Sequence, residues 1–162
     1  MRQVVLIRPS LIALSLMFAL SLSACGGMST DDYLKEIAPL AQQYNTARDV
    51  VDHAIKAVDS ATTLREGLDA ARKGTSVLEN EIRVMNNAYR DLGNKDVPEK
   101  FHKHQQATLS AWRAGIEAAT TLKLYLEKAL ASGQTDDTLV VAANRLFAEE
   151  DRYQLEARQA LR

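Results

Sequence analysis

The side chains best suited to chemistry in this 162-residue chain are three histidines and one carboxylate on an apolar helix face. His102 and His104 are two residues apart, so on a helix they point in different directions and cannot share a metal ion as residues four apart would. His53 is expected near the far end of a different helix. The spacing therefore indicates no three-ligand metal site, and no cofactor is expected.

Glu150 is the most unusual residue on an expected apolar seam, because a carboxylate that faces a core costs free energy unless it is paired. The favoured interpretation is a small helix rotation that lets Glu150 reach water and turns Phe147 inward. A buried ion pair with Arg83, at a similar height in an antiparallel bundle, is one alternative. A polar ligand pocket shared with Gln105 is another.

Aromatic side chains offer a second possible site. Trp112 and the 5 tyrosines could line a ligand cavity, in particular near Tyr89, Trp112 and Glu150. At helical spacing, aromatic residues more often fill a core. No serine–histidine–aspartate set, glycine-rich loop or nucleophile motif stands out. No catalytic residue is assigned, and the protein is not expected to be an enzyme.

Four helical segments must position these residues: about 30–59, 63–92, 97–131 and 136–161. Apolar residues recur along them in alternating steps of four and three, most regularly from Leu64 to Leu92. Only 7 glycines and 3 prolines interrupt the chain, and no alternating β-branched run predicts a strand. Long helices with short connections predict an all-α, antiparallel up-down-up-down four-helix bundle with left-handed, coiled-coil-like packing.

Local signals mark the expected helix ends. Ser29 or Thr30 can cap the first helix, and Pro39 should kink that helix or mark its true start. Asp96 is expected to cap the third helix in a capping box with the glutamate three residues later. Thr135 is expected to cap the fourth.

Residues 1–24 have the features of an export signal. Arg2 and Arg8 supply the positive start, and an apolar stretch follows from Leu11 to Leu22. This stretch is shorter than the roughly 20 residues that a membrane span needs. The signal ends in Leu22-Ser23-Ala24-Cys25.

That ending resembles the lipobox of bacterial prolipoproteins, in which an aliphatic residue and two small ones precede a cysteine. The resemblance implies cleavage before Cys25 and acylation of its thiol and new amino terminus, so that lipid such as palmitate anchors the chain. Residues 25–29 would then be the lipidated cysteine and a short linker, and residues 30–162 the bundle. Gly26 stands where an aspartate would favour inner-membrane retention, which indicates the periplasmic face of the outer membrane in a Gram-negative cell. In a cell with one membrane, the protein would face outward.

The rest of the chain gives weaker functional signals. The order Val97-Pro98-Glu99, His102, His104 at a helix start resembles helical envelope lipoproteins of unassigned function. A net charge of −1 argues against a nucleic-acid partner. The leading hypothesis is a non-enzymatic, lipid-anchored envelope module that binds another envelope protein or cell-wall material, or has a structural role. The alternative is a small-ligand or metal-binding bundle with an internal pocket.

Overall fold

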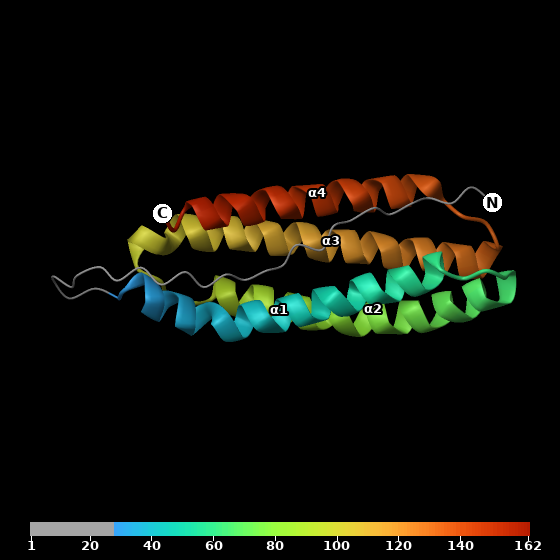
Figure 1. Ribbon diagram of the computed structural model, residues 1–162, viewed down its shortest axis with the longest axis horizontal. Helices are drawn as coiled ribbons and strands as arrows, with labels where there is room; N and C mark the ends of the chain where they lie inside the picture. Colours follow the sequence, from blue (N-terminus) through green and yellow to red (C-terminus); the bar gives the residue numbers. More distant parts are fainter. Residues whose placement is uncertain (1–27) are drawn as a thin grey trace.

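The computed structural model describes residues 28–162 (Figure 1). They form α1 (Thr30–Asp59), α2 (Leu64–Gly93), the short 3₁₀ helix η1 (Glu99–Phe101), α3 (His102–Ser132) and α4 (Asp137–Gln159). No strand occurs in this range. The export signal, the lipobox and Cys25 lie outside the described residues.

The helices run alternately up and down, and each packs along the next one in the chain. The start of α1, the connection 94–98 and the end of α4 lie at one end of the bundle, which we call the anchor end (Figure 1). The turns at 60–63 and 133–136 lie at the other, or distal, end. The all-α four-helix bundle is therefore confirmed, whereas the left-handed sense of its packing stays a prediction. Among residues 28–162, no helix combines the length and apolar character that crossing a membrane requires.

The α1–α4 pair is joined differently from the pairs that follow one another in the chain. Between α1 and α4, which no loop connects, no pair of Cα atoms comes within 8 Å. Long side chains must therefore bridge these two helices. This pair contains the site described below.

Side-chain caps explain where two helices begin. The Ser29 hydroxyl oxygen accepts a hydrogen bond from the Asp32 backbone N–H at 3.1 Å, as predicted for α1. At the start of α2, the Glu66 N–H donates to the Thr63 hydroxyl and the Thr63 N–H donates to the Glu66 carboxylate, each at 3.2 Å. This capping box satisfies two amide groups that the first helical turn leaves without partners. Pro39 lies inside a continuous α1 and does not mark its start.

Two predicted helix starts were wrong. Asp96 caps no helix, because η1 intervenes: the Phe101 N–H donates to the Pro98 carbonyl at 2.8 Å, and α3 begins at His102 without a side-chain cap. The cap of α4 is Asp136 rather than its neighbour Thr135. The chain enters α4 after Gly133, whose φ of +68° is the left-handed conformation that glycine adopts without strain.

The predicted apolar seam of α2 forms much of the core. Leu78, Met85 and Leu92 are fully buried, at 0% exposure. The seam fails at its first residue, since Leu64 is 68% exposed. Leu64 lies in the first turn of α2 at the distal end, where the neighbouring helices no longer cover it.

Candidate functional site: a buried polar cluster between α1 and α4

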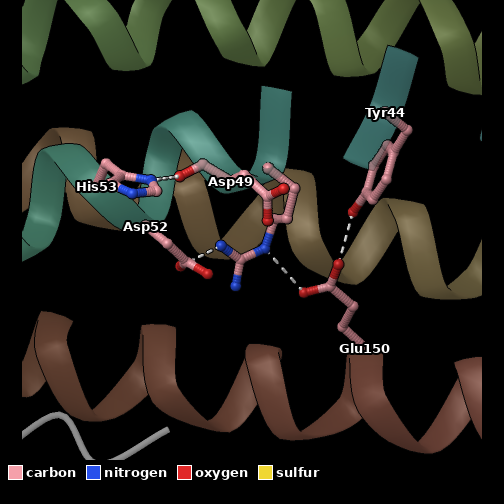
Figure 2. Close-up of polar contacts among 6 residues, drawn as sticks. Tyr44, Asp49, Asp52, His53 and Glu150 are labelled. Atoms are coloured by element: carbon pink, nitrogen blue, oxygen red, sulfur yellow. Dashed lines mark hydrogen bonds and ion pairs between the residues drawn. The ribbon is translucent and has the colours of Figure 1, made fainter. Parts of the chain in front are cut away.

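Glu150 is buried, with 2% of its surface exposed. The Tyr44 hydroxyl donates to its Oε1 at 2.9 Å, and the Arg48 Nε–H donates to its Oε2 at 3.1 Å (Figure 2). Phe147, three residues earlier on the same face of α4, is also buried. The interpretation that Glu150 reaches water was therefore wrong, because the α4 face turns both residues inward and α1 supplies the polar partners.

The ion pair that compensates this carboxylate is with Arg48, not Arg83. The side chain of Arg83 is exposed, and its guanidinium donates to the Asn80 side-chain oxygen at 2.7 Å. Arg83 belongs to α2, which, like α1, has no Cα atom within 8 Å of α4, but it is α1 whose side chains bond to Glu150. The alternative of a buried Glu150–Arg83 pair was therefore also wrong.

Arg48 is itself 5% exposed and has three kinds of partner. Besides Glu150, it forms an ion pair with Asp52 one turn further along α1. Its guanidinium carbon lies 3.9 Å from the centre of the Phe147 ring, which is a cation–π contact. Burial disfavours the charged guanidinium, but the carboxylates of Glu150 and Asp52 outweigh burial and raise the pKa of Arg48. Arg48 therefore keeps its positive charge in the cluster.

Tyr44 joins three helices at this point. Its ring stacks on Trp112 of α3 with ring centroids 4.7 Å apart, and its hydroxyl lies 3.3 Å from the Trp112 carbonyl oxygen as well as bonding to Glu150. Burial, followed by the nearby Glu150 carboxylate, raises the pKa of Tyr44 well above its ordinary value. Tyr44 is therefore a neutral donor, and Trp112 is core filling rather than the wall of an open pocket.

Gly115 on α3 makes room for the cluster. A Cβ atom at this position would lie 2.6 Å from Glu150 Oε1 and would also collide with the Tyr44 hydroxyl. Any larger residue would therefore displace both polar groups. In the sequence Gly115 was only one more small residue on a helix seam, so its role depends on contacts that spacing alone does not reveal.

Gln105 does not belong to this cluster. Its side-chain amide donates to the backbone carbonyls of Leu92 and Lys95, at 2.8 and 3.0 Å. These bonds satisfy carbonyl groups at and just after the end of α2. Gly115, which adjoins Glu150, is about 15 Å further along α3 at the helical rise per residue. The hypothesis of a polar pocket shared by Glu150 and Gln105 is therefore wrong.

Two histidines have partners that do not belong to the cluster. His104 is 8% exposed, and its Nδ1 lies 2.8 Å from the hydroxyl of Tyr33, whose ring stacks on Phe101 at 4.2 Å. Burial lowers the pKa of His104 and raises that of Tyr33 to about 12. His53 is exposed on α1, where its Nδ1 lies 2.7 Å from the Asp49 carbonyl oxygen.

The remaining histidine, His102, has the sequence spacing of a metal-binding motif. Glu99 and His102 have the Glu-x-x-His spacing that di-iron bundles use. In the part of the chain that the structure describes, no group of three histidine, cysteine or carboxylate side chains gathers as a metal site would require. The His102 ring instead lies 2.9 Å from the Val97 carbonyl oxygen.

The interior near the distal end contains a small cavity of about 30 Å³ between α1, α3 and α4. Its walls are mainly apolar, with Asp59 at one side; they comprise Ile55, Val58, Asp59, Leu122, Tyr125, Leu126 and Val140. A space of this size suits one or two water molecules. Near Trp112 and Glu150, where a ligand pocket was considered, the side chains of Tyr44 and Arg48 occupy the interior.

The cluster is arranged to join helices. Glu150 accepts from two donors, Arg48 lies between two carboxylates, and Tyr44 keeps its proton. Across residues 28–162, every buried side-chain nitrogen or oxygen has a hydrogen-bond partner.

Comparison with known proteins adds no functional assignment to this geometry. No family model, curated protein or solved structure matches this chain.

Proposed function

We propose that this chain is a non-enzymatic lipoprotein of the bacterial envelope. Acyl groups on Cys25 would hold it at the membrane, and its helical bundle would bind another envelope protein or cell-wall material, or serve a structural role. The observation that carries the proposal is the lipobox-like order Leu22-Ser23-Ala24-Cys25 after a basic and apolar leader. Two or three acyl chains give stable anchoring, since each buried CH₂ contributes about 0.8 kcal/mol.

The arrangement of the bundle supports a role outside its core. The polar groups of the α1–α4 cluster are engaged with one another, which favours a structural role for them over ligand binding. Three of the exposed large aliphatic residues lie towards the distal end: Leu64 at 68%, Val141 at 69% and Leu124 at 43% exposure. These side chains are open to a partner that approaches the distal half of the bundle.

The site of anchoring follows from the residue after the cysteine. Gly26 lacks the carboxylate that would favour retention at an inner membrane. In a cell with two membranes, we therefore place the protein on the periplasmic face of the outer membrane. In a cell with one membrane, it would stand on the outer face.

Replacement of the cysteine tests the proposal directly. Cys25→Ser removes the thiol that accepts the lipid, and should leave an unprocessed chain that takes up no labelled palmitate. Ser23→Gly is the matched control, because it keeps a small residue in the lipobox and should be processed and labelled like the wild type. If Cys25→Ser is processed, labelled and recovered in the same membrane fraction as the wild type, the proposal is wrong.

A further inference from the structure

The anchor end of the bundle is firmly joined to the start of α1. Tyr33 is fully buried, stacks on Phe101 and lies within hydrogen-bonding distance of His104. One turn later, Glu36 accepts a hydrogen bond from the Lys95 ammonium group at 2.7 Å. Met28 packs against the same core. The first described residues therefore cannot swing independently of the bundle.

The distance from this end to the proposed anchor is limited by chain length. Two residues separate Cys25 from Met28. At no more than about 3.5 Å per residue, Met28 lies within roughly 10 Å of the acylated cysteine. This step rests on the proposed function, since it requires lipid on Cys25. Given that lipid, the anchor end must lie next to the bilayer.

Basic side chains gather at this end from three elements. Lys100 in η1 and Lys103 in the first turn of α3 are exposed, as are Arg158 in the last turn of α4 and Arg162 just beyond it. None of the four forms an ion pair within residues 28–162.

Acidic side chains lie at the same end. Asp31 and Asp32 are in the first turn of α1, where the helix dipole favours negative charge, and Asp32 also bonds to Ser29. Asp96 and Glu99 are exposed near η1. The end is therefore of mixed charge, with basic groups available to oxygens that approach from outside.

We propose that the anchor end is a membrane-docking surface whose basic side chains contact phospholipid phosphates. Lys100 and Lys103 lie around the start of α3, and Arg158 and Arg162 around the end of α4, whereas the tether leads to α1. Contact with headgroups at these positions would therefore keep the bundle upright rather than pivoting on its tether. Basic groups at an anionic surface strengthen association by up to about fivefold each, and the acidic neighbours reduce that gain. The distal end would stand about 45 Å from the membrane, the length of a 30-residue helix.

Spin labels at the two ends test this orientation on the acylated protein in vesicles of phosphatidylethanolamine and phosphatidylglycerol. Asn94→Cys and Gln134→Cys place labels at exposed positions of the anchor and distal ends. A relaxation agent carried on lipid headgroups should relax the label at 94 at least threefold more strongly than the label at 134. Replacing the four basic residues with glutamine should at least halve this ratio.

A matched variant separates docking from net charge. Glutamine at Arg65, Lys73, Arg113 and Arg145, which are exposed and lie away from the anchor end, removes the same charge and should leave the ratio unchanged. Intact mass first establishes whether Cys25 carries lipid, and a chain without lipid would overturn the proposed function together with this inference. An acylated chain with equal relaxation at both labels, or stronger relaxation at 134, would overturn the inference alone. So would a ratio that falls equally in both glutamine variants.

Discussion

The Arg48–Glu150 ion pair should contribute a large coupling energy to folding and little net stability. A double-mutant cycle with Arg48→Met and Glu150→Leu separates these two quantities. Removing one member of a buried pair typically costs about 3–5 kcal/mol, because the other charge stays buried without compensation. Replacing both members with apolar residues of similar volume is often neutral.

The structure indicates how much stability each single variant should lose within this range of about 3–5 kcal/mol. In Glu150→Leu, Arg48 keeps its ion pair with Asp52, whose side chain is 33% exposed, so we expect a loss of about 3 kcal/mol. In Arg48→Met, the buried Glu150 carboxylate keeps the hydrogen bond from Tyr44 but loses its cation, so we expect a loss of about 3–5 kcal/mol.

The free energy of unfolding of the double variant should lie within about 1 kcal/mol of the wild-type value. Tyr44 loses its carboxylate acceptor there but still lies 3.3 Å from the Trp112 carbonyl oxygen, so its hydroxyl is not left without a partner. The coupling energy, which is the sum of the two single losses less that of the double variant, is then at least about 5 kcal/mol.

Urea unfolding followed by circular dichroism measures all four proteins, since domains are typically stable by about 5–15 kcal/mol and the single variants should still fold. The control cycle uses the exposed pair Arg145–Glu149 on α4, with alanine at each position, where the coupling should be below about 1 kcal/mol. A buried-pair coupling as small as that of the control would refute the reasoning.

Three further predictions concern packing and pH. Gly115→Ala should destabilise the bundle by about 1–3 kcal/mol in urea unfolding. Gly67→Ala is the control and should be neutral or stabilising, because the atom nearest to its new Cβ is 3.8 Å away. Equal effects of the two variants would contradict the close approach at Gly115. Burial lowers the pKa of His104 below 6.5, so the unfolded chain binds the proton more readily than the folded one. The free energy of unfolding should therefore fall as the pH drops through 6.5 towards the folded pKa, by up to about 1.4 kcal/mol per pH unit. His104→Gln should reduce this fall, and unchanged pH dependence in His104→Gln would refute the assignment. Leu78→Ala should cost about 2–5 kcal/mol, and a loss below about 0.5 kcal/mol would refute its place in the core.

The helices could be predicted because the signals that form them are local. The steps of four and three along α2 place Leu78, Met85 and Leu92 on one face, and these three residues are fully buried. The Ser29 cap is likewise a signal of a few residues. The start of α3 was predicted wrongly because Asp96 and Glu99 have the spacing of a capping box. Glu99 instead begins the 3₁₀ helix η1, and α3 begins after it at His102.

The polar cluster could be predicted only in part. Burial on an apolar seam was the reason to single out Glu150, but its partner was misassigned. Sequence spacing estimates a residue's height along a bundle, which Arg83 matched. It does not say which helices are neighbours and which are diagonal, and that distinction selects Arg48. One signal was available: Tyr44, Arg48 and Asp52 are spaced four apart and therefore share one face of α1.

Intact mass spectrometry of the protein extracted from membranes tests the central claim most directly. The account predicts a chain that begins at Cys25 and carries a diacylglyceryl group, with or without a further acyl chain on its amino terminus. A chain that retains residues 1–24, or one that begins elsewhere and carries no lipid, would contradict it.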